Sequence, residues 1–297
     1  MRKQLKFSLL CLIILFCSSK KVIALEEYET TMKQDILVLF MAYPEYIKGI
    51  ERDTNNNVYL ILNSGKRVLY DDKIQKNHEA KLNNPDIQDM LEQIYPLESL
   101  EKLPETNYDP GRGRIYSILN EVYGANKGLV EKNLKSTSGG QFNKANGAST
   151  ALNFVIKEVN EASKINPKIG GFVYPINGTY NFRYISGTGR LSPHAFGIAI
   201  DIKSHPNDYW KWNTRENGEK RMLTYPKELV EIFEKHNFIW GGKWGHFDIL
   251  HFEYRPEIIL KAKYFSRKVE KTQPWYIGVP DEDKIRDYIN VIDNSLE

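Results

Sequence analysis

The sequence predicts an α+β fold, with an antiparallel sheet and flanking helices. Short strand-like segments stand on either side of helical segments, without the regular alternation of strand and helix that a parallel sheet requires. Turn residues join two of these segments into a hairpin, and the helical segments carry apolar residues at three- and four-residue spacing. With 297 residues, 41% of them hydrophobic, the chain can bury a sizeable core as one large domain or two small ones.

The first 24 residues have the pattern of an export signal. Basic side chains at Arg2, Lys3 and Lys6 precede an apolar run from Phe7 to Cys17, and a small-residue cleavage site ends at Ala24. We expect cleavage after Ala24 and an exported protein, extracellular or associated with the cell wall. The apolar run is well short of the roughly 20 residues of a bilayer span, so no membrane span should remain; an uncleaved anchor is the alternative.

Cysteine content and charge limit the possible partners. Both cysteines, Cys11 and Cys17, lie in the signal segment, so the cleaved protein would have no thiol for a disulfide or a thiolate metal site. Cleavage would leave 36 basic side chains against 38 acidic ones, a net charge near −2. This balance gives no reason to expect a nucleic-acid partner, and we expect a monomer.

Residues 25–105 are expected to form an N-terminal region of helices and one hairpin. Glu26 to Tyr43 has a helical pattern. The segments Val58–Leu62 and Lys66–Tyr70 flank the turn residues Asn63-Ser64-Gly65, which predicts a β-hairpin. A further helix is expected from Asn84 through Ile94.

Residues 106–265 contain the other predicted elements, and residues 266–297 form a C-terminal extension of unknown role. Proline and glycine mark Tyr108–Arg114 as a loop, and a helix from Ile115 to Val122 follows it. A stronger helix begins at Ser149 and ends before Pro167, and another opens at Pro226. Short strands are predicted at Gly171–Tyr174 and Tyr180–Ile185.

The segment SPHAFGIAID, residues 192–201, has one bulky and one bare face if it is a strand. In a strand from Gly197 to Lys203, three isoleucines share one face, and Gly197, Ala199 and Asp201 share the other. Because protein interiors are close-packed, a bare face beside an acid suggests room for a cation and its substrate. His194, just before the strand, could turn its imidazole toward Asp201. The plain alternative is a surface histidine and a strand-end aspartate.

A second cluster, WGGKWGHFDILHFEY at residues 240–254, supplies a third candidate ligand in His251. Two histidines and one carboxylate leave an open fourth position for water, which is the pattern of catalytic zinc sites. Zinc lowers the pKa of its bound water to around 7 and polarises a carbonyl, and a general base must lie within reach of that water. Asp248 is the candidate base, with Glu253 and His246 as rivals.

The spacing Ser192-x-His194-x-x-Gly197-x-Ala199-x-Asp201, followed by Asp248-x-x-His251, resembles the zinc peptidases of the D-alanyl-D-alanine carboxypeptidase and L-alanyl-D-glutamate endopeptidase family. These enzymes cut peptidoglycan peptides. The similarity is strongest from Gly171 to Arg255 and extends faintly upstream through Asp109-Pro110-Gly111-Arg112. It implies a Hedgehog/DD-peptidase-like fold, Zn²⁺ held by His194, Asp201 and His251, and Asp248 as the base.

The resemblance also implies residues that contact the substrate. An arginine upstream of the first motif binds substrate and stabilises the charged intermediate, and Arg183 matches it, with Arg190 as a rival. Ser192 could bond the substrate or shape the loop, and Trp244 could line the cleft or belong to the core. Many carboxypeptidases of the family carry Glu at the base position. This chain has Asp248 there, which is more like the endopeptidase branch, so the identity of the cleaved bond stays open.

Two functions of different class are consistent with these residues. The first is an exported zinc peptidase that hydrolyses peptidoglycan stem peptides, as a D,D-carboxypeptidase or an L,D-endopeptidase. The second is a non-catalytic zinc-containing module that binds the cell wall or takes part in signalling. Asp248 favours the enzyme, because a pure binding module needs no base beside its ligands.

Overall fold

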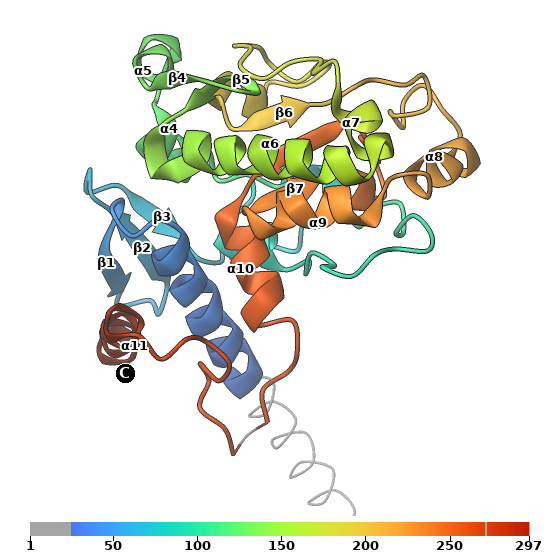
Figure 1. The fold of residues 1–297 in the computed structure, drawn as a ribbon. Helices are drawn as coiled ribbons and strands as arrows, with labels where there is room; N and C mark the ends of the chain where they lie inside the picture. The colour runs from blue at the N-terminus through green and yellow to red at the C-terminus, as the bar shows by residue number, and fades with distance from the viewer. Residues whose placement is uncertain (1–24, 271, 297) are drawn as a thin grey trace, which may run out of the picture.

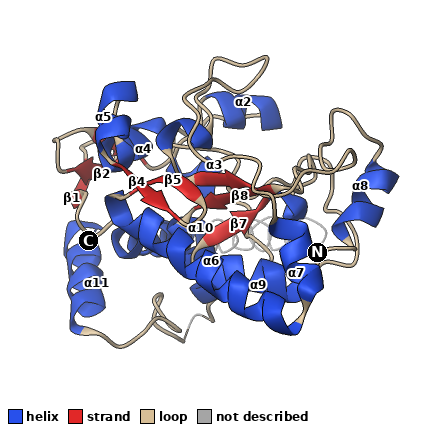
Figure 2. Ribbon diagram, turned by 45° about the horizontal axis from the view of Figure 1, so that its top comes forward, coloured by secondary structure: helices blue, strands red, loops and turns tan. Residues whose placement is uncertain are grey.

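A computed structural model describes residues 25–270 and 272–296, in which helices and three small antiparallel sheets share one hydrophobic core (Figures 1 and 2). This mixture confirms the α+β class. The export signal predicted at residues 1–24 lies outside the described residues. Among the helices of the described ranges, none has both the length and the apolar character needed to cross a bilayer.

The N-terminal region forms a three-stranded sheet packed against a helix. The predicted helix is present over residues 25–42, and the predicted hairpin is formed by β2 (Val58–Leu62) and β3 (Arg67–Leu69). A further strand, β1 (Ile47–Arg52), pairs with β2 and is not evident in the sequence. A register shift between Ile47 and Gly49 breaks the alternation of buried and exposed residues that reveals a strand.

The C-terminal extension packs on this N-terminal sheet. Helix α11 (Asp283–Leu296) lies against β1 and buries Ile285, Ile289 and Ile292 (Figure 1). Lys33, in the helix over residues 25–42, forms an ion pair with Asp293 of α11, with 2.6 Å between the charged atoms. The first helix and α11 therefore contact each other, although they lie at opposite ends of the sequence.

Short helices and loops connect the N-terminal sheet to the rest of the chain: α2 (His78–Asn83), α3 (Ile87–Leu91), α4 (Tyr116–Tyr123) and α5 (Lys127–Lys132). Helix α3 begins after Asp86, which forms a capping box with Asp89, and it ends before the predicted Ile94. Helix α4 matches the helix predicted after the Tyr108–Arg114 loop.

A second three-stranded sheet carries two of the three candidate metal ligands, Asp201 and His251. Its order is β6 (Ala199–Asp201), β8 (His251–Tyr254) and β7 (Phe238–Trp240), all antiparallel. Helices α6 (Ala148–Ile165) and α9 (Lys227–Lys235) cover one face of it (Figure 1). Phe233 of α9 stacks on Phe252 of β8 with ring centroids 3.8 Å apart. Helix α10 (Pro256–Tyr264) follows β8 and contacts β7.

The remaining elements surround this sheet: the hairpin β4 (Leu134–Thr137) and β5 (Gly140–Asn143), the helix α8 (Arg215–Met222), and the 3₁₀ turns η1 (Ala145–Gly147), η2 (Pro193–Phe196) and η3 (Gly241–Lys243).

Two predicted strands are wrong. Residues 171–173 belong to helix α7 (Pro167–Val173), because Asn166 caps the backbone N–H of Lys168 and Pro167 takes the first helical position. These start signals outweigh the strand-like Phe-Val-Tyr. The segment Tyr180–Ile185 forms no strand and makes only an isolated bridge, between Tyr184 and Leu191. The predicted strand from Gly197 to Lys203 is shorter, because β6 covers only Ala199–Asp201.

Candidate metal centre

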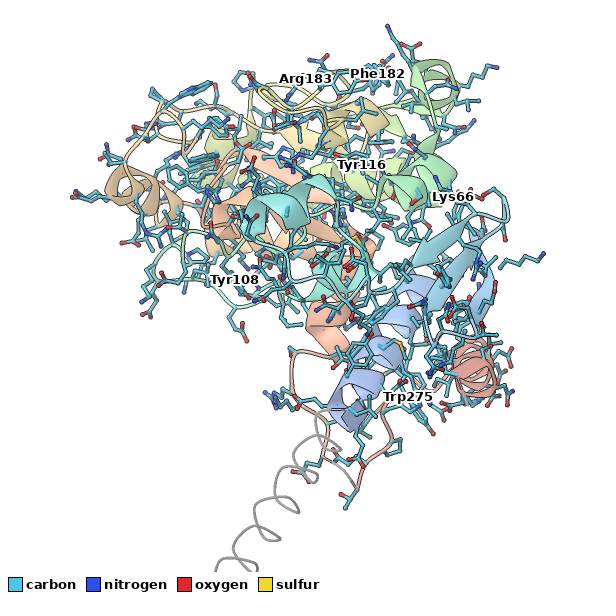
Figure 3. All side chains as sticks on the ribbon, turned by 180° about the vertical axis from the view of Figure 1, so that it is seen from behind. Lys66, Tyr108, Tyr116, Phe182, Arg183 and Trp275 are labelled. Carbon is cyan, nitrogen blue, oxygen red and sulfur yellow. The ribbon has the colours of Figure 1, made fainter. Side chains whose placement is uncertain are left out.

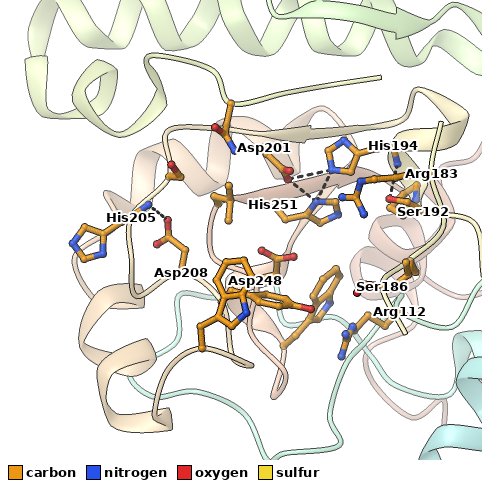
Figure 4. Close-up of a pocket in the computed structure, with 18 of the residues that line it drawn as sticks. Arg112, Arg183, Ser186, Ser192, His194, Asp201, His205, Asp208, Asp248 and His251 are labelled. Atoms are coloured by element: carbon orange, nitrogen blue, oxygen red, sulfur yellow. Dashed lines mark hydrogen bonds and ion pairs between the residues drawn. The ribbon is translucent and has the colours of Figure 1, made fainter. Parts of the chain in front are cut away.

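Three side chains from separate elements converge at the edge of the β6–β8–β7 sheet (Figure 4). His194 lies in η2, Asp201 ends β6, and His251 begins β8, where the strand register places it directly opposite Asp201. His251 Nδ1 lies 2.9 Å from Asp201 Oδ1, and His194 Nε2 lies 3.2 Å from the same oxygen. The two ring nitrogens are 3.3 Å apart.

These separations suit a small tetrahedral cation. Nitrogen and oxygen ligands about 2.0–2.1 Å from zinc at tetrahedral angles stand about 3.3 Å from one another. The three observed separations, 2.9, 3.2 and 3.3 Å, are close to that value. The donor set is two imidazoles and one carboxylate, which is a catalytic zinc set and leaves one coordination position for water or substrate. The residues therefore fit the ion that the sequence resemblance implies.

The bare face predicted for SPHAFGIAID has another cause. Gly197 closes η2 with a φ of +67°, and a Cβ there would lie 2.8 Å from a side-chain carbon of Leu134 in β4. Ala199 is completely buried, and neither residue lines the cavity beside the metal ligands. The expectation that they are small to keep a cleft open is wrong: Gly197 allows a left-handed turn against β4 and β5.

Neighbouring groups hold both imidazoles in place. The carbonyl oxygen of Thr179 lies 2.5 Å from His194 Nδ1, which places the proton on that nitrogen and leaves Nε2 to face Asp201. Glu253 Oε2 lies 3.7 Å from His251 Nε2, on the side of the ring away from Asp201. Arg114 contacts both oxygens of Glu253, with Nε 2.8 Å from Oε1 and Nη2 2.5 Å from Oε2.

The electrostatics of the cluster favour a bound cation. Burial would raise the pKa of Asp201, but hydrogen bonds to His194 and His251 outweigh burial and hold this pKa far below its usual range. Burial lowers the pKa of His251, yet Asp201 and Glu253 raise it overall to about 10. An imidazole between two carboxylates lies in a strongly negative environment, which either a proton or a metal ion can neutralise.

Asp248 lies beside this cluster and lines the same cavity of about 650 Å³. Burial raises the pKa of its carboxyl to about 6, because the opposing influence of His251 is smaller and the Asp201 charge adds to the shift. A carboxylate with a pKa close to neutral is well suited to take and return a proton. The rival candidates differ: Glu253 is paired with Arg114, and His246 Nδ1 lies 2.6 Å from Asp109. Neither rival lines the cavity.

Of the four residues predicted to contact substrate, three line the cavity and one does not. Arg183, Ser192 and Trp244 line the cavity. Arg183 is exposed, at the end of the molecule away from Trp275 (Figure 3). Ser192 is buried, and its hydroxyl accepts the backbone N–H of His194, so it shapes the η2 turn. Trp244 is also buried, with its ring centroid 5.8 Å from that of His251.

Arg190 does not line this cavity. Its side chain donates to the backbone carbonyl of Leu82, 3.0 Å away. The cavity lining also includes Arg112, from the upstream end of the family resemblance, and Trp212. Arg114 and Tyr209 line it too, and the sequence gives neither of them a role in the site.

A second His-Asp-His group, His78, Asp109 and His246, is less suited to a metal. Its two imidazoles are stacked, with 19° between the ring planes and 5.2 Å between the centroids. Lone pairs in nearly parallel, separated planes cannot both point at one ion. Asp109 Oδ2 also lies 3.2 Å from Arg112, and Oδ1 accepts the backbone N–H of His246. We therefore interpret Asp109 as the shared acceptor of these cationic and polar groups.

Comparison with known proteins adds a family match. Residues 186–254 match the model of a family described as D-alanyl-D-alanine carboxypeptidase. The matched segment contains His194, Asp201, Asp248 and His251, and the match supports the peptidase family that the sequence motifs indicate. Comparisons with curated proteins and with solved structures found no significant match, so the Hedgehog/DD-peptidase-like fold stays a prediction.

Proposed function

We propose that the protein is an exported zinc peptidase that hydrolyses peptidoglycan stem peptides, and the family match over residues 186–254 supports a peptidase. The reaction is that of a D,D-carboxypeptidase or an L-alanyl-D-glutamate endopeptidase. One observation carries the proposal: three ligand atoms 2.9–3.3 Å apart lie beside a carboxyl of raised pKa in one cavity.

His194, Asp201 and His251 would hold the zinc ion. When bound there, zinc would polarise the scissile carbonyl and lower the pKa of a water molecule. Thr179 and Glu253 keep the two imidazoles oriented for this task.

Asp248 acts as the general base and Arg183 as the anion-binding group. The Asp248 carboxylate takes a proton from the attacking water and returns it to the nitrogen of the leaving amine, so no net proton is gained or lost by the residue. Arg183 stabilises the negative charge that develops on the carbonyl oxygen. Ser192 and Trp244 line the substrate path.

Replacing Asp248 with Asn tests the proposal while leaving the side-chain volume nearly unchanged. Product release from a defined stem peptide should fall about 10²- to 10⁴-fold, and the zinc content should stay the same. Asp287→Asn, on the exposed part of α11, is the matched control and should change neither. Undiminished turnover in the Asp248 variant would move the base to another residue. Peptide binding by the zinc-loaded wild type without product at any pH would favour the non-catalytic module instead.

The remaining expectations concern organisation and location. We propose that residues 1–24 are removed as a signal peptide after Ala24, that residues 25–105 form the N-terminal region, and that residues 106–265 form the peptidase domain. Residues 266–297 form an extension whose helix α11 packs on β1. Mass spectrometry of the secreted protein should find an N-terminus at Leu25, and sedimentation should find a monomer.

A further inference from the structure

The loop Tyr108–Arg114 is fixed against the metal centre. The backbone N–H of Gly245 donates to the carbonyl of Tyr108 at 2.8 Å, and the indole N–H of Trp244 donates to that of Pro110 at 2.9 Å. Gly111 has a φ of +81°, and a Cβ there would lie 2.7 Å from the Cδ1 atom of Ile239 in β7. The loop therefore needs glycine at this position and is tightly packed on the β6–β8–β7 sheet, which carries Asp201 and His251.

The side chain of Arg112 extends from this loop to the cavity that contains the candidate metal ligands. Its Nη1 lies 3.2 Å from Asp109 Oδ2, and its guanidinium carbon lies 5.5 Å from the centre of the Trp244 ring. Asp109 is itself buried and fixed by His246, through both the backbone N–H and the ring. Arg112 is thus oriented before any ligand arrives, and its side chain is still 19% exposed.

The environments of the three cavity arginines differ. Arg114 is buried and holds Glu253 with two nitrogens, so its role is to orient the metal site. Arg112 and Arg183 stand on the same side of the cavity, with Ser186 between them, and Asp208 and His205 stand on the opposite side (Figure 4). A guanidinium has five N–H donors in a planar fork, and Arg112 uses one terminal nitrogen for Asp109. Such a fork is the preferred partner of a carboxylate.

Both candidate substrates place a carboxylate in the same chemical position. In D-alanyl-D-alanine, the residue whose nitrogen leaves carries the terminal carboxylate on its α-carbon. In L-alanyl-D-glutamate, where the glutamate continues the chain through its side chain, the leaving residue carries a free α-carboxylate. We propose that Arg112, positioned by Asp109 and Trp244, binds this carboxylate on the leaving-group side of the scissile bond. The inference rests on the proposed function and adds a specificity-determining residue to it.

Binding to the full-length, zinc-loaded Asp248→Asn protein tests this proposal without needing turnover. The probes are the pentapeptide L-Ala-γ-D-Glu-L-Lys-D-Ala-D-Ala and two derivatives, one amidated at the C-terminal carboxylate and one at the glutamate α-carboxylate. Adding Arg112→Gln should weaken binding of the parent peptide roughly 10- to 100-fold, the size expected for a charge-assisted bond. For the peptide in which the carboxylate that Arg112 binds is amidated, Arg112→Gln should cause almost no further loss of affinity. If that peptide is the one amidated at the C-terminus, the site is a D,D site; if it is the one amidated at the glutamate, the site is an L,D site.

Two further variants keep the test interpretable. Arg112→Lys keeps the charge beside Asp109 but not the fork, so it should cause a smaller loss with the same dependence on the carboxylate. Arg67→Gln, in β3 and paired with Glu51, is the control and should bind all peptides like its parent. No binding of the parent peptide, an unchanged affinity in Arg112→Gln, or equal losses for all three peptides would overturn the inference. If the peptides bind in the predicted Arg112-dependent way but the zinc-loaded wild-type protein cleaves none of them, the proposed function is refuted and the inference about Arg112 is not.

Discussion

Replacing Glu253 with Gln tests whether the fully buried carboxylate behind His251 supports the metal site. Burial opposes ionisation of Glu253, but Arg114 and Arg255 hold its pKa far below the usual range. Gln keeps the volume and removes the charge that faces His251 Nε2 at 3.7 Å. The change therefore alters the orientation and basicity of a candidate ligand without touching the ligand itself.

Two separate losses are expected from this substitution. Loss of the carboxylate partner of a metal-binding histidine typically lowers the metal affinity 10- to 100-fold, or by about 1.4–2.7 kcal/mol. Arg114 would also lose a partner that it contacts at 2.5 and 2.8 Å, and breaking one side of a buried ion pair costs about 3–5 kcal/mol of stability. The zinc affinity and the free energy of unfolding should therefore fall together.

Competition with a chromophoric chelator measures the zinc affinity, and urea unfolding of the metal-free protein measures the stability. Glu257→Gln is the matched control, because Glu257 is equally buried and pairs with Arg255 at 2.5 Å. It should lower the stability by a similar amount and leave the zinc affinity unchanged. Equal zinc affinity in the Glu253 variant and the wild type would refute the role given to Glu253.

Two other predictions concern stability. Gly197→Ala should destabilise the protein by about 1–3 kcal/mol, because its φ is +67° and the new methyl group would meet Leu134; urea unfolding that matches the wild type would contradict this account. Hydrogen bonds and charges around Asp109 outweigh burial and lower its pKa from 3.8 to about 2, so its ionised form stabilises the fold above about pH 4 and this contribution disappears as the pH falls toward 2. In the presence of chelator, Asp109→Asn should cost about 2 kcal/mol at pH 5 and much less near pH 2, and a pH-independent difference would show that the ionised group is not responsible.

The candidate ligands could be located from the sequence because zinc chemistry admits few residue types. His194 and Asp201 stand out beside an apolar strand, and His251 lies in a second apolar strand. Their convergence depends on the pairing of Asp201 with His251 across β6 and β8, which spacing alone only suggests. Their role as zinc ligands stays a proposal.

Other parts of the site arise only from tertiary contacts. The Thr179 oxygen at His194 is a backbone carbonyl, which no residue type reveals. Arg112 comes from a loop far upstream, and its position depends on Asp109 and Trp244. Position 197 requires glycine because its φ is positive and a side chain there would meet Leu134 of β4. The alternation of side chains along the strand suggested a different reason, namely an open cleft. Local helix signals at Asn166 and Pro167 likewise overrule the strand propensity of the residues that follow.

The most direct test of the central claim is mass spectrometry of a defined stem peptide incubated with the full-length protein, with and without a zinc chelator. The account predicts cleavage at a single peptide bond, loss of that product in the chelator, and its return when one equivalent of zinc per chain is restored. Cleavage that persists after complete removal of zinc would contradict it.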